Sequence, residues 1–326
     1  GIKDLVGNTA ADVSSVTDAS SVAFDKTAPT ISPVSIASNN SDNTLAKIGD
    51  IITLTFTSNE SISTPTVTIL GSSASITGGP TSWSATYTTQ SGDADGLVAF
   101  TISGISDPSG NTAGNVTATT DTTSVTFDEI APVLDTVSIA SSNTDTTKAV
   151  PGDVITLAFA SSEDIEVPTV TIQGNSVTPT GGPSSWTANY TAQAGDTEGT
   201  VTFNISGIVD MAGNTASDVT SITTGSNVTF DETPPTISPV SIASNNADPS
   251  KSKVGDKITV SFTSNESIAT PTATISGSAA TVLGGPTAWT AEYTMGSGDP
   301  EGTVTFNITL IEDLAGNTAS DVSSVT

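Results

Sequence analysis

The sequence repeats itself every 103 residues, with no insertion or deletion between the copies. One tryptophan recurs at positions 83, 186 and 289, and a Gly-Asp pair recurs with the same spacing at 49–50, 152–153 and 255–256. A fixed period of this length is typical of one domain copied in tandem. The first question is therefore what an array of near-identical modules does, rather than which reaction a single site catalyses.

Both ends of the sequence fall inside repeats. Residues 1–17 (GIKDLVGNTAADVSSVT) match residues 310–326 (LIEDLAGNTASDVSSVT), three periods later. We therefore expect residues 1–25 to be the C-terminal remnant of a preceding repeat. Repeats are then expected over 26–128, 129–231 and 232–326, the last with its end truncated, so that the chain is part of a longer array.

Composition excludes several classes of function. The chain has 34 acidic and 7 basic residues, a formal net charge of −27, and its basic residues are all lysines. Nucleic acid is excluded as a partner because phosphate binding needs clustered lysine or arginine. The sequence contains no cysteine, which excludes disulfides, thiolate metal sites and cysteine nucleophiles. No apolar run is long enough for a membrane span in this window.

Alternating apolar and polar residues predict half-buried β-strands. In residues 50–60 the apolar Ile52, Leu54 and Phe56 alternate with threonines, and the same period recurs over 82–88 and 97–103. Period-two patterns rich in β-branched residues favour strands, and glycine, proline, asparagine and aspartate between them favour turns. The predicted core of the first complete repeat is Ile52, Leu54, Phe56, Trp83, Tyr87, Val98, Phe100 and Ile102, with equivalents in the other repeats.

Seven strands are predicted in that repeat, over 31–38, 51–58, 66–70, 73–77, 82–89, 97–103 and 113–127. Seven short strands in about 100 residues are typical of an immunoglobulin-like fold. The expected fold class is all-β: tandem seven-stranded immunoglobulin-like β-sandwiches in an extended, end-to-end array. The tryptophan lies on the fifth strand and no cysteine pair exists, so the antibody hallmarks are missing. The threonine-rich faces also suggest ice binding, but a twisted sandwich lacks the flat array which that function needs.

Acidic residues occupy the same seven positions in each of the three copies. Strand direction places three of these positions at one pole of each sandwich: before the first strand, after the second and after the sixth. These acids, with an asparagine of the last loop, are the predicted metal ligands: Asp25, Glu60, Asp107 and Asn111; Asp128, Glu163, Asp210 and Asn214; Asp231, Glu266, Asp313 and Asn317. Acids of the opposite pole, facing the next module, are secondary candidates: Asp93, Asp95, Asp196 and Glu198.

The chemistry of these groups favours Ca²⁺. Converging carboxylates repel one another unless a cation neutralises them, and Ca²⁺ takes about six to eight oxygen ligands. Transition metals prefer histidine or cysteine, and the chain has neither. The alternative is that these acids only form turns. That alternative explains Asp107 and Asp93 well but explains Glu60 poorly, because glutamate is not a turn residue.

Two motifs carry a resemblance to a known family. The pattern D-x-x-G-N occurs at 107–111, 210–214 and 313–317, and F-D-x-x-x-P at 24–29, 127–132 and 230–235. In these motifs the chain resembles the bacterial immunoglobulin-like (BIg-type) repeats of large surface adhesins and biofilm-associated proteins, over essentially all 326 residues. The resemblance implies secretion to the cell surface, tandem arrays and Ca²⁺ near the linkers. It implies no catalytic residue.

The predicted function is structural. Glycosidase chemistry by paired carboxylates would need a cleft and aromatic sugar platforms, whereas the tryptophan and tyrosine of each repeat lie at inward strand positions, so no enzyme is predicted. We expect a stalk, spacer or fibre-forming repeat region of an extracellular bacterial protein, stiffened by Ca²⁺ at the inter-repeat junctions. Its partners would be neighbouring copies of the repeat or chain, with any surface ligand bound elsewhere in the parent protein. The alternative is an adhesive module that itself binds carbohydrate or protein.

Overall fold

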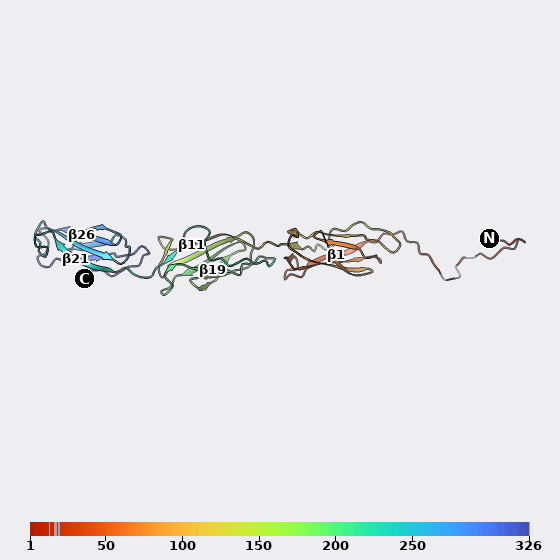
Figure 1. Cartoon of the computed structure of the whole chain (residues 1–326), viewed down its shortest axis with the longest axis horizontal. Helices are drawn as coiled ribbons and strands as arrows, with labels where there is room; N and C mark the ends of the chain where they lie inside the picture. The colour runs from red at the N-terminus through yellow and green to blue at the C-terminus, as the bar shows by residue number, and fades with distance from the viewer. Residues whose placement is uncertain (13, 16–17, 19, 326) are drawn as a thin grey trace. The chain divides into compact units, whose positions relative to one another are not determined.

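The protein is all-β in the part that the structure describes, residues 1–12, 14–15, 18 and 20–325 of a computed structural model. Those residues form strands, bridges and turns, and none of them belongs to a helix that could cross a membrane. The chain divides into two compact units, Gly1–Ile130 with Ala212–Asn214, and Ala131–Met211 with Thr215–Thr326. Three separate hydrophobic cores, within 34–127, 134–230 and 237–311, define three β-sandwiches (Figure 1).

The first sandwich lies in the first unit and has two main sheets and one small sheet. The larger sheet has the order β1 (Ile31–Ser38), β3 (Ile51–Ser58), β7 (Ser82–Thr88), β6 (Ser75–Gly78). The second has the order β5 (Ser72–Ser73), β4 (Thr66–Ile69), β9 (Phe100–Ser103), and the small sheet has β2 (Leu45–Ala46), β10 (Thr126–Phe127), β8 (Gly96–Leu97). This is the expected immunoglobulin-like sandwich.

The two sandwiches of the second unit repeat this plan. The middle one has β11 (Leu134–Ser141), β13 (Val154–Ser161), β17 (Ser185–Thr191), β16 (Thr180–Gly181); β15 (Asn175–Val177), β14 (Thr169–Ile172), β19 (Phe203–Ser206); and β12 (Lys148–Ala149), β20 (Thr229–Phe230), β18 (Gly199–Thr200). The third has β21 (Ile237–Ser244), β22 (Lys257–Ser264), β26 (Ala288–Thr294), β25 (Thr281–Gly284) and β24 (Ser278–Ala279), β23 (Thr272–Ile275), β27 (Phe306–Thr309). Among its described residues the third sandwich has no counterpart of the small sheet.

The alternating pattern of the sequence sets the register and the core. Strands β3 and β7 pair antiparallel, with Phe56 opposite Trp83 and Leu54 opposite Ala85, so that one face of the sheet is apolar. All the predicted core residues of this repeat are buried except Tyr87, which is half-buried. Tyr87 stays near the surface because its hydroxyl donates to the Asp93 carboxylate, at 2.9 Å. In the third sandwich, Val304 is only half-buried, unlike its counterparts Val98 and Val201.

The long last strand predicted over 113–127 is wrong. Only Thr126–Phe127 forms a strand, β10, and the residues before it contact a series of different partners. Val116 bridges to Ile102 on β9, and the Thr120 amide then donates to the Val34 carbonyl on β1. The segment crosses from one sheet to the edge of the other, so no continuous ladder forms. The predicted strand over 97–103 is likewise divided, into β8 and β9, which belong to different sheets.

Because the three cores are separate, we expect a core substitution to destabilise only the sandwich that contains it. Phe159 is buried in the core of the middle sandwich, at 3% exposure. Phe159→Ala should lower the free energy of unfolding of this sandwich by ~3–5 kcal/mol, because apolar burial is lost and a cavity remains. Amide hydrogen exchange should accelerate in β13 and β17 and stay unchanged in β3 and β22. The half-exposed Val154 on the same strand is the control, and Val154→Ala should have a small effect. An equal loss of protection in all three sandwiches would show that the cores are not independent.

Candidate metal centre

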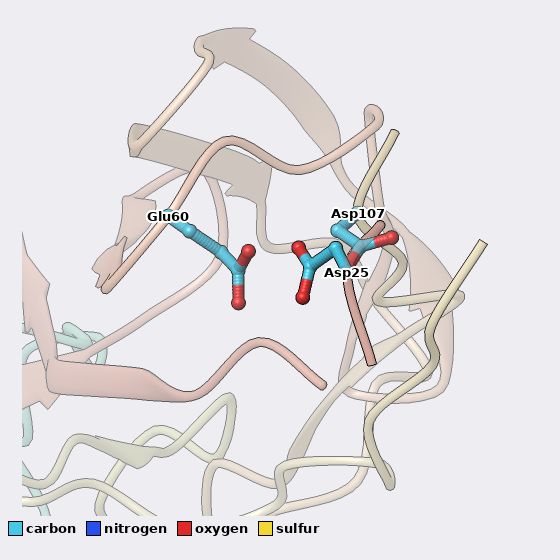
Figure 2. Close-up of side chains that lie close together, drawn as sticks. All are labelled: Asp25, Glu60 and Asp107. Atoms are coloured by element: carbon cyan, nitrogen blue, oxygen red, sulfur yellow. The ribbon is translucent and has the colours of Figure 1, made fainter. Parts of the chain in front are cut away.

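Three carboxylates converge at one end of the first sandwich. Asp25 precedes β1, Glu60 follows β3 and Asp107 follows β9, and each contributes an oxygen to a group whose atoms all lie within 4.8 Å of one another. Figure 2 shows the Glu60 and Asp25 carboxylates pointing toward one another, with Asp107 beside Asp25. The convergence predicted from strand direction is therefore present within this unit.

Hydrogen bonds between the segments explain why these side chains meet. The Ser63 amide donates to the Ser106 carbonyl at 2.8 Å, which joins the loop after β3 to the loop after β9. The Thr30 amide donates to Asn59 Oδ1 at 2.6 Å, and the Asn59 amide donates to the Thr30 carbonyl at 3.1 Å. The segment before β1 is thereby fixed beside Glu60.

Asp107 is the buried member of the group, at 3% exposure. Its Oδ2 accepts from Asn111 Nδ2 at 2.7 Å, and its Oδ1 accepts from the Asn111 backbone amide at 2.9 Å. These bonds, the side-chain bond first, lower the pKa of Asp107. Gly110 completes the turn with a φ of 91°, a conformation that glycine adopts at little cost. The D-x-x-G-N motif thus holds a buried carboxylate in its ionised form.

Asn111 connects this turn to the linker. Its Nδ2 also donates to the Asp25 carbonyl at 3.3 Å. In this arrangement the amide nitrogen of Asn111 holds Asp107 and the linker together. Direct coordination of a cation by Asn111, and by its equivalents Asn214 and Asn317, stays a prediction.

The pKa of Glu60 is raised above its ordinary value in this cluster. Burial raises its pKa, and the negative charges of Asp25 and Asp107 raise it further. The two salt bridges found among the described residues, Lys47–Asp50 and Lys257–Glu292, lie outside the group. The cluster is therefore a set of mutually repelling carboxylates that a cation would stabilise.

The third sandwich repeats the arrangement with Asp231, Glu266 and Asp313, whose oxygens also lie within 4.8 Å of one another. Asp313 is 4% exposed, and its Oδ1 accepts three backbone amides, including that of Asn317 at 2.9 Å. Asn317 Nδ2 donates to the Asp231 carbonyl at 3.1 Å. Burial, then Asp231 and Asp313, raise the pKa of Glu266, with a smaller contribution from Glu198.

The predicted metal ligands of the middle sandwich are divided between the two units. Asp128 and Asn214 belong to one unit, and Glu163 and Asp210 belong to the other. That these four residues bind a common cation stays a prediction, made from the internal repeat of the sequence.

The secondary acids lie in local turns. Asp93 accepts from the Gln90 amide at 2.8 Å, and Asp196 accepts from the Gln193 amide at 2.8 Å and from the Tyr190 hydroxyl. Burial and the bond to Asp196 raise the pKa of Tyr190 to about 12. Within the described part of the chain, neither Asp93 nor Asp196 belongs to a cluster of three acids that could hold a metal ion. Their turn geometry agrees with the turn-forming interpretation, and their coordination of a cation stays a prediction.

Asp95 and Glu198 bind the linker that follows their own sandwich. Asp95 Oδ1 accepts from the Glu129 amide at 2.8 Å, and Glu198 Oε1 accepts from the Glu232 amide at 3.1 Å. The sequence interpretation missed the reciprocal contact, in which Glu129 accepts from the Gly92 amide at 3.0 Å. Glu232 does the same with the Gly195 amide at 2.8 Å. A signal existed, since glutamate follows the linker aspartate in two copies, but Lys26 breaks the column in the first.

These groups could hold a metal ion. Each offers three carboxylates, one of them buried and fixed by backbone amides, and the chain contains no histidine or cysteine that would compete as a ligand. An all-oxygen set of this kind suits a hard divalent cation. The residues present fit such an ion because the linker acid and both loop acids already converge.

Solved structures with tandem immunoglobulin domains resemble the chain at low similarity. A titin segment of domains I67–I69 is 10% identical over 92% of this chain and 98% of its own, with a TM-score of 0.39. The I9–I11 tandem of titin is 8% identical over 86% of this chain and 94% of its own, with a TM-score of 0.31. A chain from the complex of Dpr2 with DIP-Theta is 13% identical over 91% of this chain and 98% of its own, with a TM-score of 0.29. At these values the likeness concerns the fold alone. No protein-family model matches the sequence, and no curated protein matches it either.

The raised pKa of Glu60 predicts that the ionised carboxylate destabilises the first sandwich. Because its folded-state pKa lies above the unfolded value, the cost of the ionised form, from burial and then from repulsion by Asp25 and Asp107, appears as pH rises through the folded pKa and is absent well below the unfolded pKa. In EDTA, Glu60→Gln should therefore raise the melting temperature of the first sandwich at pH 7 and have little effect near pH 3. Glu166→Gln, which removes one exposed charge, is the control. A destabilisation of equal size at both pH values would contradict the repulsion.

Proposed function

We propose that the chain is the stalk, spacer or fibre-forming repeat region of a secreted bacterial surface protein, stiffened by Ca²⁺ at the junctions between repeats. The observation that carries this proposal is the composition of the acidic group. One acid, Asp25 or Asp231, belongs to the linker before a sandwich, and the other two belong to loops of that sandwich. A cation held by all three fixes the linker on the sandwich that follows.

The choice of Ca²⁺ rests on the ligand set. Carboxylates and carbonyls in flexible geometry suit Ca²⁺, whereas Mg²⁺ requires stricter octahedral geometry and keeps more of its water. The Asp25 carbonyl already lies beside the group, because Asn111 binds it. Burial and then the charges of Asp25 and Asp107 raise the pKa of Glu60, and without a cation the repulsion between Glu60 and Asp25 acts directly on the linker acid.

The role at the cell surface, in adhesion or in a biofilm, rests on the motif resemblance. An array of sandwiches with acidic surfaces suits a long soluble spacer, because a net charge of −27 opposes association through unspecific contacts. We propose no enzymatic role. The groove beside Trp83 is lined by hydroxyl and apolar residues and contains no ionisable side chain that could act as an acid or base.

A ligand-binding role is the second candidate, and one observation favours it. A groove of about 360 Å³ lies beside Trp83, between Pro33, Thr55 and Thr77, and related grooves lie beside Trp186 and Trp289. A recurring groove lined by hydroxyls is suited to a carbohydrate. Chemical-shift changes confined to Thr55 and its equivalents on addition of an oligosaccharide mixture would support this role, and unchanged shifts would remove it.

The proposed function predicts a calcium-dependent stability. Ca²⁺ at 100 times its dissociation constant should stabilise each site by about 2.7 kcal/mol if it binds only the folded form. Calorimetry in Ca²⁺ against EDTA should therefore show a raised melting temperature, with a smaller rise in Mg²⁺. The combined variant Glu60→Gln, Glu163→Gln and Glu266→Gln should lose this response.

The matched control removes three exposed charges elsewhere, by Asp12→Asn, Asp135→Asn and Glu166→Gln. It should keep the full response to Ca²⁺. No rise for the native chain in millimolar Ca²⁺, or an equal loss in both combined variants, would exclude calcium at these groups.

A further inference from the structure

The Gly-Asp pair that recurs in the sequence orients an asparagine in each sandwich. In the middle sandwich Asn143 Nδ2 donates to Asp153 Oδ2 at 2.9 Å, and the Val150 amide donates to the same oxygen at 2.9 Å. The asparagine-to-aspartate bond recurs in the other two sandwiches, at 2.8 Å for Asn40 and Asp50 and at 2.7 Å for Asn246 and Asp256. The candidate metal centre gives these aspartates no role, although they recur in every copy.

The orientation of the Asn143 amide group follows from what each partner can accept. An ionised carboxylate only accepts hydrogen bonds, so the nitrogen of the amide group must face Asp153. The oxygen of the amide group, Asn143 Oδ1, accepts from the Asp145 backbone amide at 3.2 Å. The oxygen and one N–H group are therefore used within the loop, and the second N–H group is directed to a partner outside it.

That partner is the next sandwich along the chain. Asn143 Nδ2 donates to the Ala315 carbonyl at 2.9 Å, and Asn40 Nδ2 donates to the Ala212 carbonyl at 2.8 Å. Each contact joins residues that are 172 positions apart, and both of its residues belong to the same compact unit. Ala315 and Ala212 are each 4% exposed. Each asparagine therefore binds a buried residue of the following sandwich.

Ala315 belongs to the D-x-x-G-N turn that holds the cation group of the third sandwich. The peptide group between Ala315 and Gly316 has two partners: its carbonyl accepts from Asn143, and its N–H donates to Asp313 Oδ1 at 2.6 Å. The Ala315 amide donates to the same carboxylate oxygen at 2.7 Å. A single peptide group thus connects the middle sandwich to a carboxylate of the candidate metal centre.

The two hydrogen bonds of this peptide group support one another. Donation of the Gly316 N–H to a carboxylate polarises the peptide group, which makes the Ala315 carbonyl a stronger acceptor for Asn143. Rotation of the peptide group would break both bonds. The conformation of the D-x-x-G-N turn and its contact with the middle sandwich therefore depend on each other.

We propose that Asn143 is a positioning residue, which fastens the D-x-x-G-N turn of the third sandwich to the middle sandwich. Asn40 makes the same contact with Ala212 one repeat earlier. Asp153 and Asp50 act by orienting these asparagines. The proposal rests on the proposed spacer function and deepens it, because it names a contact that limits bending at the junction with or without a cation.

Distances between spin labels test this contact at the junction of the middle and third sandwiches. The native chain contains no cysteine, so labels can be attached at Ser176→Cys and Ala279→Cys, equivalent exposed positions on β15 and β24. In EDTA, Asn143→Ala should broaden the distance distribution measured by pulsed electron paramagnetic resonance, because the junction loses its hydrogen bond. Asn246→Ala is the matched control, since it removes the equivalent bond to Asp256 and leaves both junction contacts in place.

Ca²⁺ binding gives a second readout, which a purely local effect on the asparagine loop would not change. Because Asn143 holds the peptide group that donates to Asp313, Asn143→Ala should weaken Ca²⁺ binding at the third sandwich about five-fold, the effect of one lost hydrogen bond. The Gly316 amide resonance, followed during a Ca²⁺ titration, reports on this group separately from the others. Asn246→Ala should leave the midpoint of that titration unchanged.

A broader distance distribution and weaker Ca²⁺ binding in Asn143→Ala, with both unchanged in Asn246→Ala, would support the proposal. An unchanged distribution in Asn143→Ala, or equal broadening in the two variants, would overturn it. The labelled chain with Asn143 intact tests the calcium-stiffened spacer separately. If Ca²⁺ does not narrow its distribution while Asn143→Ala broadens it, calcium stiffening is excluded and the asparagine contact stands.

Discussion

The attachment of a linker to the sandwich that follows it depends on one asparagine amide nitrogen, which donates hydrogen bonds to two acceptors. Asn111 holds the buried carboxylate of Asp107 and, through the same amide nitrogen, the carbonyl of Asp25 in the linker. Asn317 repeats this contact in the third sandwich. Because the linker is held there, its aspartate lies beside two loop acids, and burial, followed by repulsion from these acids, raises the pKa of Glu60 and Glu266. In the first and third sandwiches, one linker acid and two loop acids thus form a group that could hold a metal ion.

The rest of each sandwich keeps this arrangement rigid. The antiparallel pairing of β1 with β3 and of β4 with β9 places the ends of three elements at one pole. Separate apolar cores stabilise each copy on its own. The linker after the first sandwich is bound by Asp95, and the linker after the middle sandwich is bound by Glu198. In the second of these linkers, Asp231 also lies beside Glu266 and Asp313 of the sandwich that follows. Acids therefore act on both sides of a linker, as hydrogen-bond acceptors before it and as candidate metal ligands after it.

Sequence alone predicted the features that depend on local periodicity. Strands 31–38 and 51–58 match β1 and β3 to the residue; alternation is regular throughout β3, and in β1 it is regular after a register shift between Ile31 and Val34. The internal repeat identified Asp25, Glu60 and Asp107 as members of one group. It could not predict the path of residues 113–127, since their partners come from four different strands, β9, β1, β2 and β8. It also missed Glu129, because the column is broken by Lys26, and it could not show that Asn111 donates through its nitrogen.

We propose that a cation held between linker and loops stiffens the array. Small-angle scattering on the native chain, in Ca²⁺ and in EDTA, tests it most directly. The account predicts a larger radius of gyration and a narrower distribution of conformations in Ca²⁺, and no response when Glu60, Glu163 and Glu266 are changed to glutamine. Identical scattering with and without Ca²⁺, or compaction on Ca²⁺ binding with the sandwiches packed side by side, would contradict it.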